Sequence, residues 1–268
     1  MGFEYLWIFA VISLVICVIG FYKYVYFLSV GYGLSVAGIG IAMIVMMLMG
    51  HFAPTNWHYF ALSALFVIYG FRLSGFLVIR EIKNIAYRKT LKEATGEESA
   101  MPIFVKIAIW LCVAVLYTAQ TSGVFFRFYN QGGMSGFTWA GIIICVLAII
   151  IESEADREKS AQKKVRPDMV ATKGLYRIVR CPNYFGEILF WTGITVSALD
   201  ILNGIGQWLT VIIAYICIVF IMFNGAQRLE KRQLGRYGST KEYHDYADKT
   251  PIIIPLLPIY HLNKEARK

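Results

Sequence analysis

Charged residues are scarce in this sequence: they make up 16% of it, whereas 57% of its residues are hydrophobic. So little charge is not expected of a soluble domain and is typical of a polytopic membrane protein. No stretch shows the alternating pattern of a membrane β-barrel strand, and no single amphipathic helix would account for so much apolar sequence. We therefore expect an all-α integral membrane protein.

The sequence also lacks the motifs of common soluble catalysts. There is no Walker phosphate loop, no zinc motif and no convincing nucleophilic triad. The five cysteines, at positions 17, 112, 145, 181 and 217, have no metal-ligand spacing, so we expect neither a metal site nor disulfides. The Gly31-Tyr32-Gly33 segment with Gly38 lies in an apolar run without a preceding strand, which favours helix packing over dinucleotide binding.

Seven apolar segments approach the roughly 20 residues that a transmembrane helix needs. They span roughly 5–22, 30–50, 57–79, 103–126, 137–151, 183–200 and 206–224. The first lacks a basic start and a small-residue cleavage site, so we expect a retained helix and not a signal peptide. We expect residues 1–268 to form a single membrane domain, with substrate-side helices over 1–126 and a cofactor-binding half over 137–258.

The net charge of +9 follows the expected topology. Lys and Arg gather at Lys23, in 80–102, in 152–182 and after 224, whereas the connections 51–56, 127–136 and 201–205 contain only Arg127. Because basic residues collect on the cytoplasmic side, this predicts an outside amino terminus and a cytoplasmic carboxyl terminus. It favours membrane lipids and an anionic cofactor as partners, and not nucleic acid. No obligate protein partner is indicated, and a bacterial inner membrane and the endoplasmic reticulum both fit.

Four charged residues follow the fifth apolar segment at helical spacing. Glu152, Asp156, Lys159 and Lys163 are separated by four, three and four residues, so they share one helical face. A solvated helix with internal ion pairs is one interpretation. A binding site is the other, since the two acids directly extend an apolar run.

The sixth segment begins with a second polar group. Pro182 suits the first turn of a helix, and the amides there, next to Arg177 and Arg180, form a natural phosphate site. Asn183 and Glu187 then lie one turn apart on one face. Helix capping with cytoplasmic anchoring explains the proline and the arginines, but not an acid at this depth.

The third apolar segment contains Tyr69, Arg72 and, two turns further, Arg80. Arg72 lies inside the apolar run, so it requires an anion or a water-filled cavity. Tyr69, one turn deeper, is then a candidate proton donor, although a tyrosine that simply packs is the simpler interpretation. The basic cluster that begins at Arg228 is suited to closing a phosphate site, or to contacting lipid headgroups.

Together these segments resemble a known family. Gly174-Leu175-Tyr176, the run from Cys181 to Glu187 and the Tyr246…Ile254-Pro255 tail are similar to the carboxyl-terminal domain of the steroid 5-alpha-reductases, over about 150–255. Glu152-x-x-x-Asp156 with Lys163 resembles the bacterial branch. The resemblance implies a seven-helix reductase that holds NADPH and passes a hydride to the β-carbon of a conjugated enone, in a steroid or another lipophilic substrate.

The resemblance also implies residue roles. Asn183 and Glu187 would contact the nicotinamide end, Glu152 and Asp156 the nucleotide, and Lys163, Arg72, Arg80 and Arg228 the phosphates; Tyr176, Arg180 and Tyr184 belong to the same cofactor-binding motifs. Tyr69 would polarise the substrate ketone. The chain departs from the family in its second segment, 30–50, which has no acid, and has Ser29 where bacterial relatives often have aspartate.

Two alternatives remain open. Membrane methyltransferases of the isoprenylcysteine or phospholipid type share an Arg-x-Pro-x-Tyr-x-Gly core, and their tail resembles Glu230 followed by Gly238 and Tyr246. Glu187 and the Glu152/Asp156 pair favour the reductase. A non-catalytic sterol or lipid binder on the same fold is the second alternative.

Overall fold

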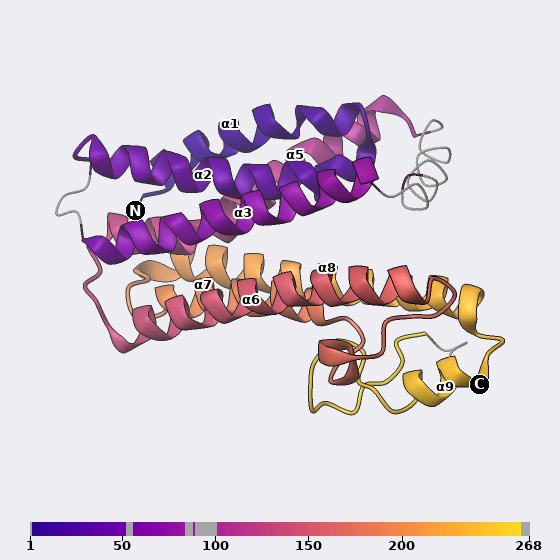
Figure 1. The fold of residues 1–268 in the computed structure, drawn as a ribbon. Helices are drawn as coiled ribbons and strands as arrows, with labels where there is room; N and C mark the ends of the chain where they lie inside the picture. The colour runs from indigo at the N-terminus through magenta and orange to yellow at the C-terminus, as the bar shows by residue number, and fades with distance from the viewer. Residues whose placement is uncertain (1, 52–55, 84–87, 89–100, 264–268) are drawn as a thin grey trace. The chain divides into compact units, whose positions relative to one another are not determined.

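The computed structural model describes residues 2–51, 56–83, 88 and 101–263, and these residues form helices without any strand. The helices, shown in Figure 1, are α1 (Leu6–Cys17), α2 (Val30–Leu48), α3 (Trp57–Lys83), α5 (Ile103–Tyr129), α6 (Gly136–Val165), α7 (Pro182–Ala198), α8 (Gly204–Tyr237) and α9 (Lys241–Ala247). Four short 3₁₀ segments accompany them: η1 (Phe3–Tyr5), η2 (Val18–Phe21), η3 (Tyr24–Leu28) and η4 (Gly174–Arg177). The predicted all-α class is confirmed for these residues.

Six helical segments of the described chain are long and apolar enough to cross a membrane, which indicates an integral membrane protein. They are Phe3–Phe21, Tyr24–Leu48, Trp57–Lys83, Ile103–Tyr129, Gly136–Val165 and Gly204–Tyr237. The remaining predicted span forms α7, which has 17 residues. At 1.5 Å per residue it is about 25 Å long, shorter than a hydrocarbon core of about 30 Å. The seven-span count and the predicted orientation are therefore not confirmed.

Helices α6 and α8 continue well beyond their apolar runs. The sequence predicts spans ending near 151 and 224, whereas the helices end at Val165 and Tyr237. The added turns are rich in Glu, Lys, Arg, Gln and Ala, which are strong helix formers whatever their hydropathy. Both extensions bring charged side chains into continuous helical register with the apolar segments.

The chain divides into two compact units. Unit 1 comprises Met1–Ile142 and Ile194–Ala214, and unit 2 comprises Ile143–Gly193 and Tyr215–Lys268. These boundaries differ from the predicted halves, 1–126 and 137–258, because α6, α7 and α8 each contribute residues to both units. The single-domain organisation stays a prediction.

Within unit 1, α2 lies alongside α3 (Figure 1), and glycines set their close approach. A Cβ added at Gly70 would overlap the Gly33 carbonyl oxygen and lie 2.7 Å from the Ala37 nitrogen. The Ser74 hydroxyl donates to the Val30 carbonyl at 3.0 Å. The expectation that the glycines of the second segment serve helix packing is thus confirmed.

A buried arginine ties the end of α5 to neighbouring segments of unit 1. Arg127 is 0% exposed and donates from Nε to the Ser197 carbonyl at 2.5 Å and from Nη1 to the Gly133 carbonyl at 2.6 Å. Its Nη2 forms an ion pair with Asp200. Burial would raise the pKa of Asp200, but hydrogen bonds from Ser135 and Arg127 outweigh it, and the pKa is lowered.

In unit 2, the charged extension of α6 holds the loop that follows it. Gln162 Oε1 accepts from the amides of Thr172 and Lys173, both at 2.9 Å, and Glu158 Oε2 accepts from the Leu175 amide at 2.8 Å. Gly174 has a φ of +66°, which favours glycine, and an added Cβ would overlap the Glu158 carboxylate. These bonds fix the loop directly before α7.

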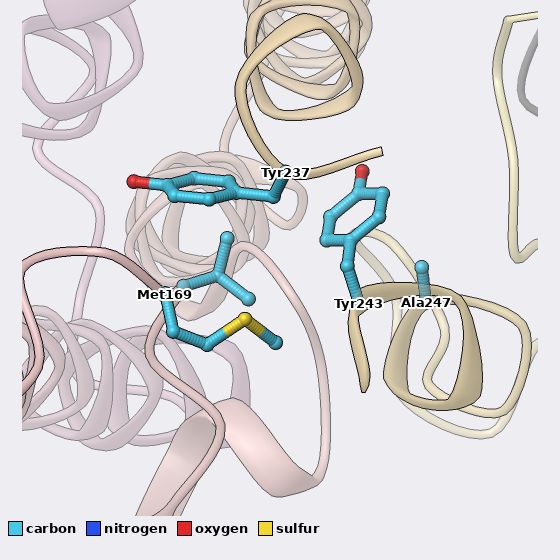
Figure 2. Close-up of a cluster of buried hydrophobic side chains, with 5 residues drawn as sticks. Met169, Tyr237, Tyr243 and Ala247 are labelled. Atoms are coloured by element: carbon cyan, nitrogen blue, oxygen red, sulfur yellow. The ribbon is translucent and has the colours of Figure 1, made fainter. Parts of the chain in front are cut away.

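The carboxyl-terminal segment of unit 2, as far as residue 263, packs against the helices of that unit. Figure 2 shows Met169 facing Tyr237 and Tyr243 in a buried cluster that also contains Val170 and Ala247. A second cluster packs Ile252 and Ile253 against Cys181, Ile188 and Ala226. The Arg180 amide donates to the Pro251 carbonyl at 2.8 Å. The tail is thereby joined to the start of α7.

Candidate functional site

Two predicted acids lie buried where α6 meets α7 in unit 2. Glu152 is 2% exposed and Glu187 is 6% exposed. A Cβ added at Gly186 would overlap the Glu152 side chain, so this glycine lets α7 approach that carboxyl closely. Glu187 Oε1 accepts a hydrogen bond from Trp191 Nε1 at 3.0 Å. The structure therefore brings Glu152 beside the turn of α7 that carries Glu187.

Asp156 lies one turn beyond Glu152 on α6, and Tyr176 lies in the 3₁₀ segment η4. Both are buried, and Tyr176 packs against Ala155 of α6. The Tyr176 carbonyl accepts from the Tyr246 hydroxyl at 2.6 Å. Burial is the largest cause that raises the pKa of the Tyr176 hydroxyl, and the charge of Asp156 adds to it. Tyr176 is therefore a neutral hydrogen-bond donor at neutral pH.

Arg180 is the buried cation of the site, and only part of it is used. Its Nη2 donates to Glu230 Oε1 at 2.5 Å and to the Tyr260 carbonyl. The amides of Leu262 and Asn263 donate to Glu230 Oε2, both at 2.9 Å. Arg180 Nε and Nη1 are buried and have no hydrogen-bond partner among the described residues. This pair therefore anchors the tail while leaving two charged N–H groups unsatisfied.

Two tyrosine hydroxyls of unit 2 are also buried. The Tyr176 Oη atom has no hydrogen-bond partner among the described residues, and the charges nearest to it are those of Asp156 and Glu158. The Tyr243 hydroxyl lies next to the Arg180 side chain: burial raises the pKa of Tyr243, while the charge of Arg180 and a hydrogen bond with it oppose the rise. Arg180 and Tyr243 are thus neighbouring buried groups that can donate, which fits an anion with several acceptor oxygens.

The other predicted cofactor residues of unit 2 differ in exposure. Asn183 and Tyr184, in the first turn of α7, are half-buried, and Arg228 on α8 is exposed. Lys163 donates to the Tyr237 hydroxyl at 2.7 Å and to the Met169 carbonyl, so its ammonium secures the loop after α6. Its role at a phosphate stays a prediction.

The residues predicted on the third segment belong to unit 1. Tyr69 is 0% exposed, and its hydroxyl lies 3.5 Å from that of Tyr32 on α2. Arg72 and Arg80 are half-buried on α3. The structure thus places Tyr69, Arg72 and Arg80 in unit 1, with Tyr69 beside Tyr32, and places the other predicted site residues in unit 2.

Sequence reasoning did not predict that Tyr32 lies beside Tyr69 or that Tyr243 lies beside Arg180, and it did not pair Arg180 with Glu230. Tyr32 carried a signal, since it is a polar aromatic residue between two glycines in an apolar run, but it was assigned to packing. Arg180 and Glu230 are 50 residues apart in the chain, and no spacing rule links them. No group of three metal-ligating side chains occurs among the described residues.

Comparison with known families gives one match, a model described as "Protein of unknown function (DUF1295)", which covers residues 32–250. The matched range runs from α2 through α9 and includes every predicted site residue. Comparisons with curated proteins and with solved structures find no match. Because the model covers most of its length, the chain belongs to the DUF1295 family.

Proposed function

We propose that this protein is a membrane-embedded reductase that uses NADPH to reduce a carbon–carbon double bond conjugated to a ketone, in a steroid-like or other lipophilic substrate. The motifs in 150–255 that resemble the steroid 5-alpha-reductases support the proposal. The observation that carries it is Arg180: this side chain is 3% exposed, and two of its nitrogens have no partner among the described residues.

The residues around Arg180 fit the phosphates of a dinucleotide. A buried donor without a partner costs about 1–3 kcal/mol, and more if charged, so such groups require an explanation. Phosphate oxygens only accept hydrogen bonds, so a phosphate bound here would accept from Arg180 and from the neighbouring Tyr243 hydroxyl. Helix α7 begins at Pro182, two residues after Arg180, so its positive end favours the same negative charge.

The nicotinamide end fits the first two turns of α7. Asn183 and Glu187 lie one turn apart, and a carboxylate accepts several hydrogen bonds, so Glu187 can receive a carboxamide N–H in addition to Trp191 Nε1. When bound, reduced nicotinamide supplies the hydride. Tyr69 Oη holds the proton directed at the substrate ketone oxygen, where negative charge develops.

The proposal includes the membrane topology that the charge distribution predicts. Seven spans, with α7 as the sixth, an outside amino terminus and a cytoplasmic carboxyl terminus, put the basic loops on one side. The partners are then membrane lipids and a lipophilic substrate. A bacterial inner membrane and the endoplasmic reticulum both meet these requirements.

A methyltransferase is the second candidate, because one contact favours it. The buried Arg180–Glu230 pair joins the Arg-x-Pro-x-Tyr-x-Gly segment to the tail, the two parts on which that resemblance depends. The buried acids Glu152 and Glu187 favour the reductase, since they lie outside that shared core.

The function is tested by NADPH oxidation with a panel of conjugated enones on the purified full chain. We expect turnover with at least one lipophilic enone and much weaker use of NADH. Glu187→Ala should abolish NADPH binding, whereas the control Glu154→Ala, which removes the acid of an exposed pair with Arg157, should not. NADPH binding without turnover on any enone would overturn the reductase proposal in favour of a lipid binder.

Tyr69→Phe tests the proposed acid separately. This variant should bind NADPH like the wild type and lose most turnover, because only the hydroxyl is removed. Normal turnover by Tyr69→Phe would show that another group protonates the substrate.

A further inference from the structure

Helix α2 contributes a hydroxyl to the surroundings of Tyr69. Tyr32 Oη lies 3.5 Å from Tyr69 Oη, and the two rings meet edge to face with centroids 6.4 Å apart. Tyr32 is 6% exposed and Tyr69 is 0% exposed. This hydroxyl pair therefore lies inside unit 1.

The position of Tyr32 is fixed from two sides. Its ring packs against the ring of Tyr117 on α5, with centroids 4.9 Å apart. Tyr117 is itself held, because its hydroxyl donates to the Phe27 carbonyl at 2.7 Å. Gly33 and Gly70, the residues that follow Tyr32 and Tyr69, lie at the closest approach of α2 and α3. The backbone contact thus sets the distance between the two hydroxyls.

No acid of α2 is available to assist Tyr69, since this helix contains none. Ser29, at its start, donates its hydroxyl to the Val25 carbonyl at 2.7 Å. A tyrosine that gives up its proton in a buried site needs a donor aimed at its oxygen, because burial penalises the anion.

We propose that Tyr32 is the positioning residue for Tyr69 in substrate reduction, donating its hydroxyl hydrogen bond to Tyr69 Oη. This inference rests on the proposed function. As the Tyr69 O–H bond breaks, the proton forms a new O–H bond at the substrate oxygen, and the electron pair stays on Tyr69 Oη. Tyr32 keeps its own proton and stabilises that electron pair. A proton from solvent then adds to the α-carbon of the enol, whose O–H proton returns to Tyr69 Oη, so that the saturated ketone forms and Tyr69 is restored.

The test is a mutant cycle with Tyr32→Phe, Tyr69→Phe and the double variant, assayed for enone reduction by the full chain. A hydrogen bond to a charged group predicts a kcat about 10- to 100-fold lower for Tyr32→Phe, with KM and NADPH affinity unchanged. Tyr32 acts only through Tyr69, so the double variant should be no slower than Tyr69→Phe alone. The inference would be overturned if the kcat losses of the two single variants multiplied in the double variant, or if Tyr32→Phe kept the wild-type kcat.

Tyr59→Phe is the matched control. It removes another buried tyrosine hydroxyl of α3, which donates to the Gly132 carbonyl at 2.9 Å, so it should lower the melting temperature and leave kcat within about twofold. An enone whose product anion is stabilised by a second carbonyl should lose less rate in both Tyr32→Phe and Tyr69→Phe. A merely structural defect at Tyr32 would slow all enones equally.

The outcomes separate the two proposals. If Tyr69→Phe loses turnover and Tyr32→Phe does not, the reductase stands and the role of Tyr32 is wrong. If none of the enones tested supports NADPH oxidation by the wild-type protein, the proposed function is wrong, and the role of Tyr32 is refuted with it.

Discussion

Arg127 and Arg180 are both buried, but they differ in how many of their nitrogens are hydrogen-bonded. Arg127 is 0% exposed and uses Nε, Nη1 and Nη2 on two carbonyls and a carboxylate. Arg180 is as deeply buried, yet its Nε and Nη1 are unsatisfied. A buried charge is tolerated when all its donors are paired, so Arg127 is explained by folding alone. Arg180 is not, and this difference is why we propose it as a ligand-binding residue.

Cys181 permits a test of burial next to Arg180. It is 3% exposed, and burial raises the pKa of its thiol to about 11. The thiolate is the reactive form, so at pH 7.5 a rise of two units lowers its fraction about 100-fold. In a variant with Cys181 as its single cysteine, we expect iodoacetamide to react at least about 100-fold more slowly than after unfolding. The same variant after unfolding is the control, and similar rates for its folded and unfolded forms would contradict the burial.

At the scale of elements, the ion pair between Arg127 and Asp200 joins the end of α5 to the segment after α7. The folded pKa of Asp200 is lowered, so the pair stabilises the protein above the unfolded value of about 3.9 and is lost as the pH falls through the folded pKa. Asp200→Asn leaves Arg127 buried without its counter-charge, which should cost about 3 kcal/mol at pH 7.

The pH dependence provides the check on this prediction. Unfolding free energies of wild type and Asp200→Asn should differ by a constant amount between pH 5 and 8. They should begin to converge as the pH falls below about 4 and should meet only below the lowered folded pKa of Asp200. A difference that persists unchanged in acid would show that the carboxylate charge does not stabilise the fold.

The close contact between α2 and α3 predicts different effects on stability for two glycine substitutions in α3, of which the second is the control. Gly70→Ala places a methyl group against the backbone of α2, and overpacking of this kind costs about 1–3 kcal/mol. Gly75→Ala meets nothing within 4 Å and should be neutral or stabilising by about 0.5–1 kcal/mol. Thermal unfolding of both variants measures the effect, and equal melting temperatures would exclude a close helix contact at Gly70.

Sequence reasoning located the elements better than their ends or their contacts. Apolar runs of membrane length predicted each long helix, because hydropathy alone decides burial in lipid. The spacing of Glu152, Asp156, Lys159 and Lys163 predicted a helical face beyond the apolar run, and α6 confirms it by continuing to Val165; the contact of Glu158 with the Leu175 amide was not predicted. Glu152 and Glu187 were found because an acid at that depth is costly, whereas the Tyr32–Tyr69 pair depends on a helix crossing that no spacing rule specifies.

At the scale of the whole molecule, six and seven membrane spans are distinguished by the side of the membrane on which each terminus lies. Helix α7 is short for a span, yet the basic loops fit the proposed orientation only if it crosses. Reporter fusions should place the amino terminus outside and the carboxyl terminus in the cytoplasm. Both termini on one side would show that an even number of helices cross.

The central claim is that the buried polar side chains of unit 2 hold a reduced dinucleotide. It is tested most directly by the dissociation constants of NADPH and S-adenosylmethionine, measured by thermal shift on the same preparation of the full chain. We predict that NADPH at 100 times its dissociation constant stabilises the protein by about 2.7 kcal/mol, and that S-adenosylmethionine has no effect. Stabilisation by S-adenosylmethionine with none by NADPH would contradict the claim.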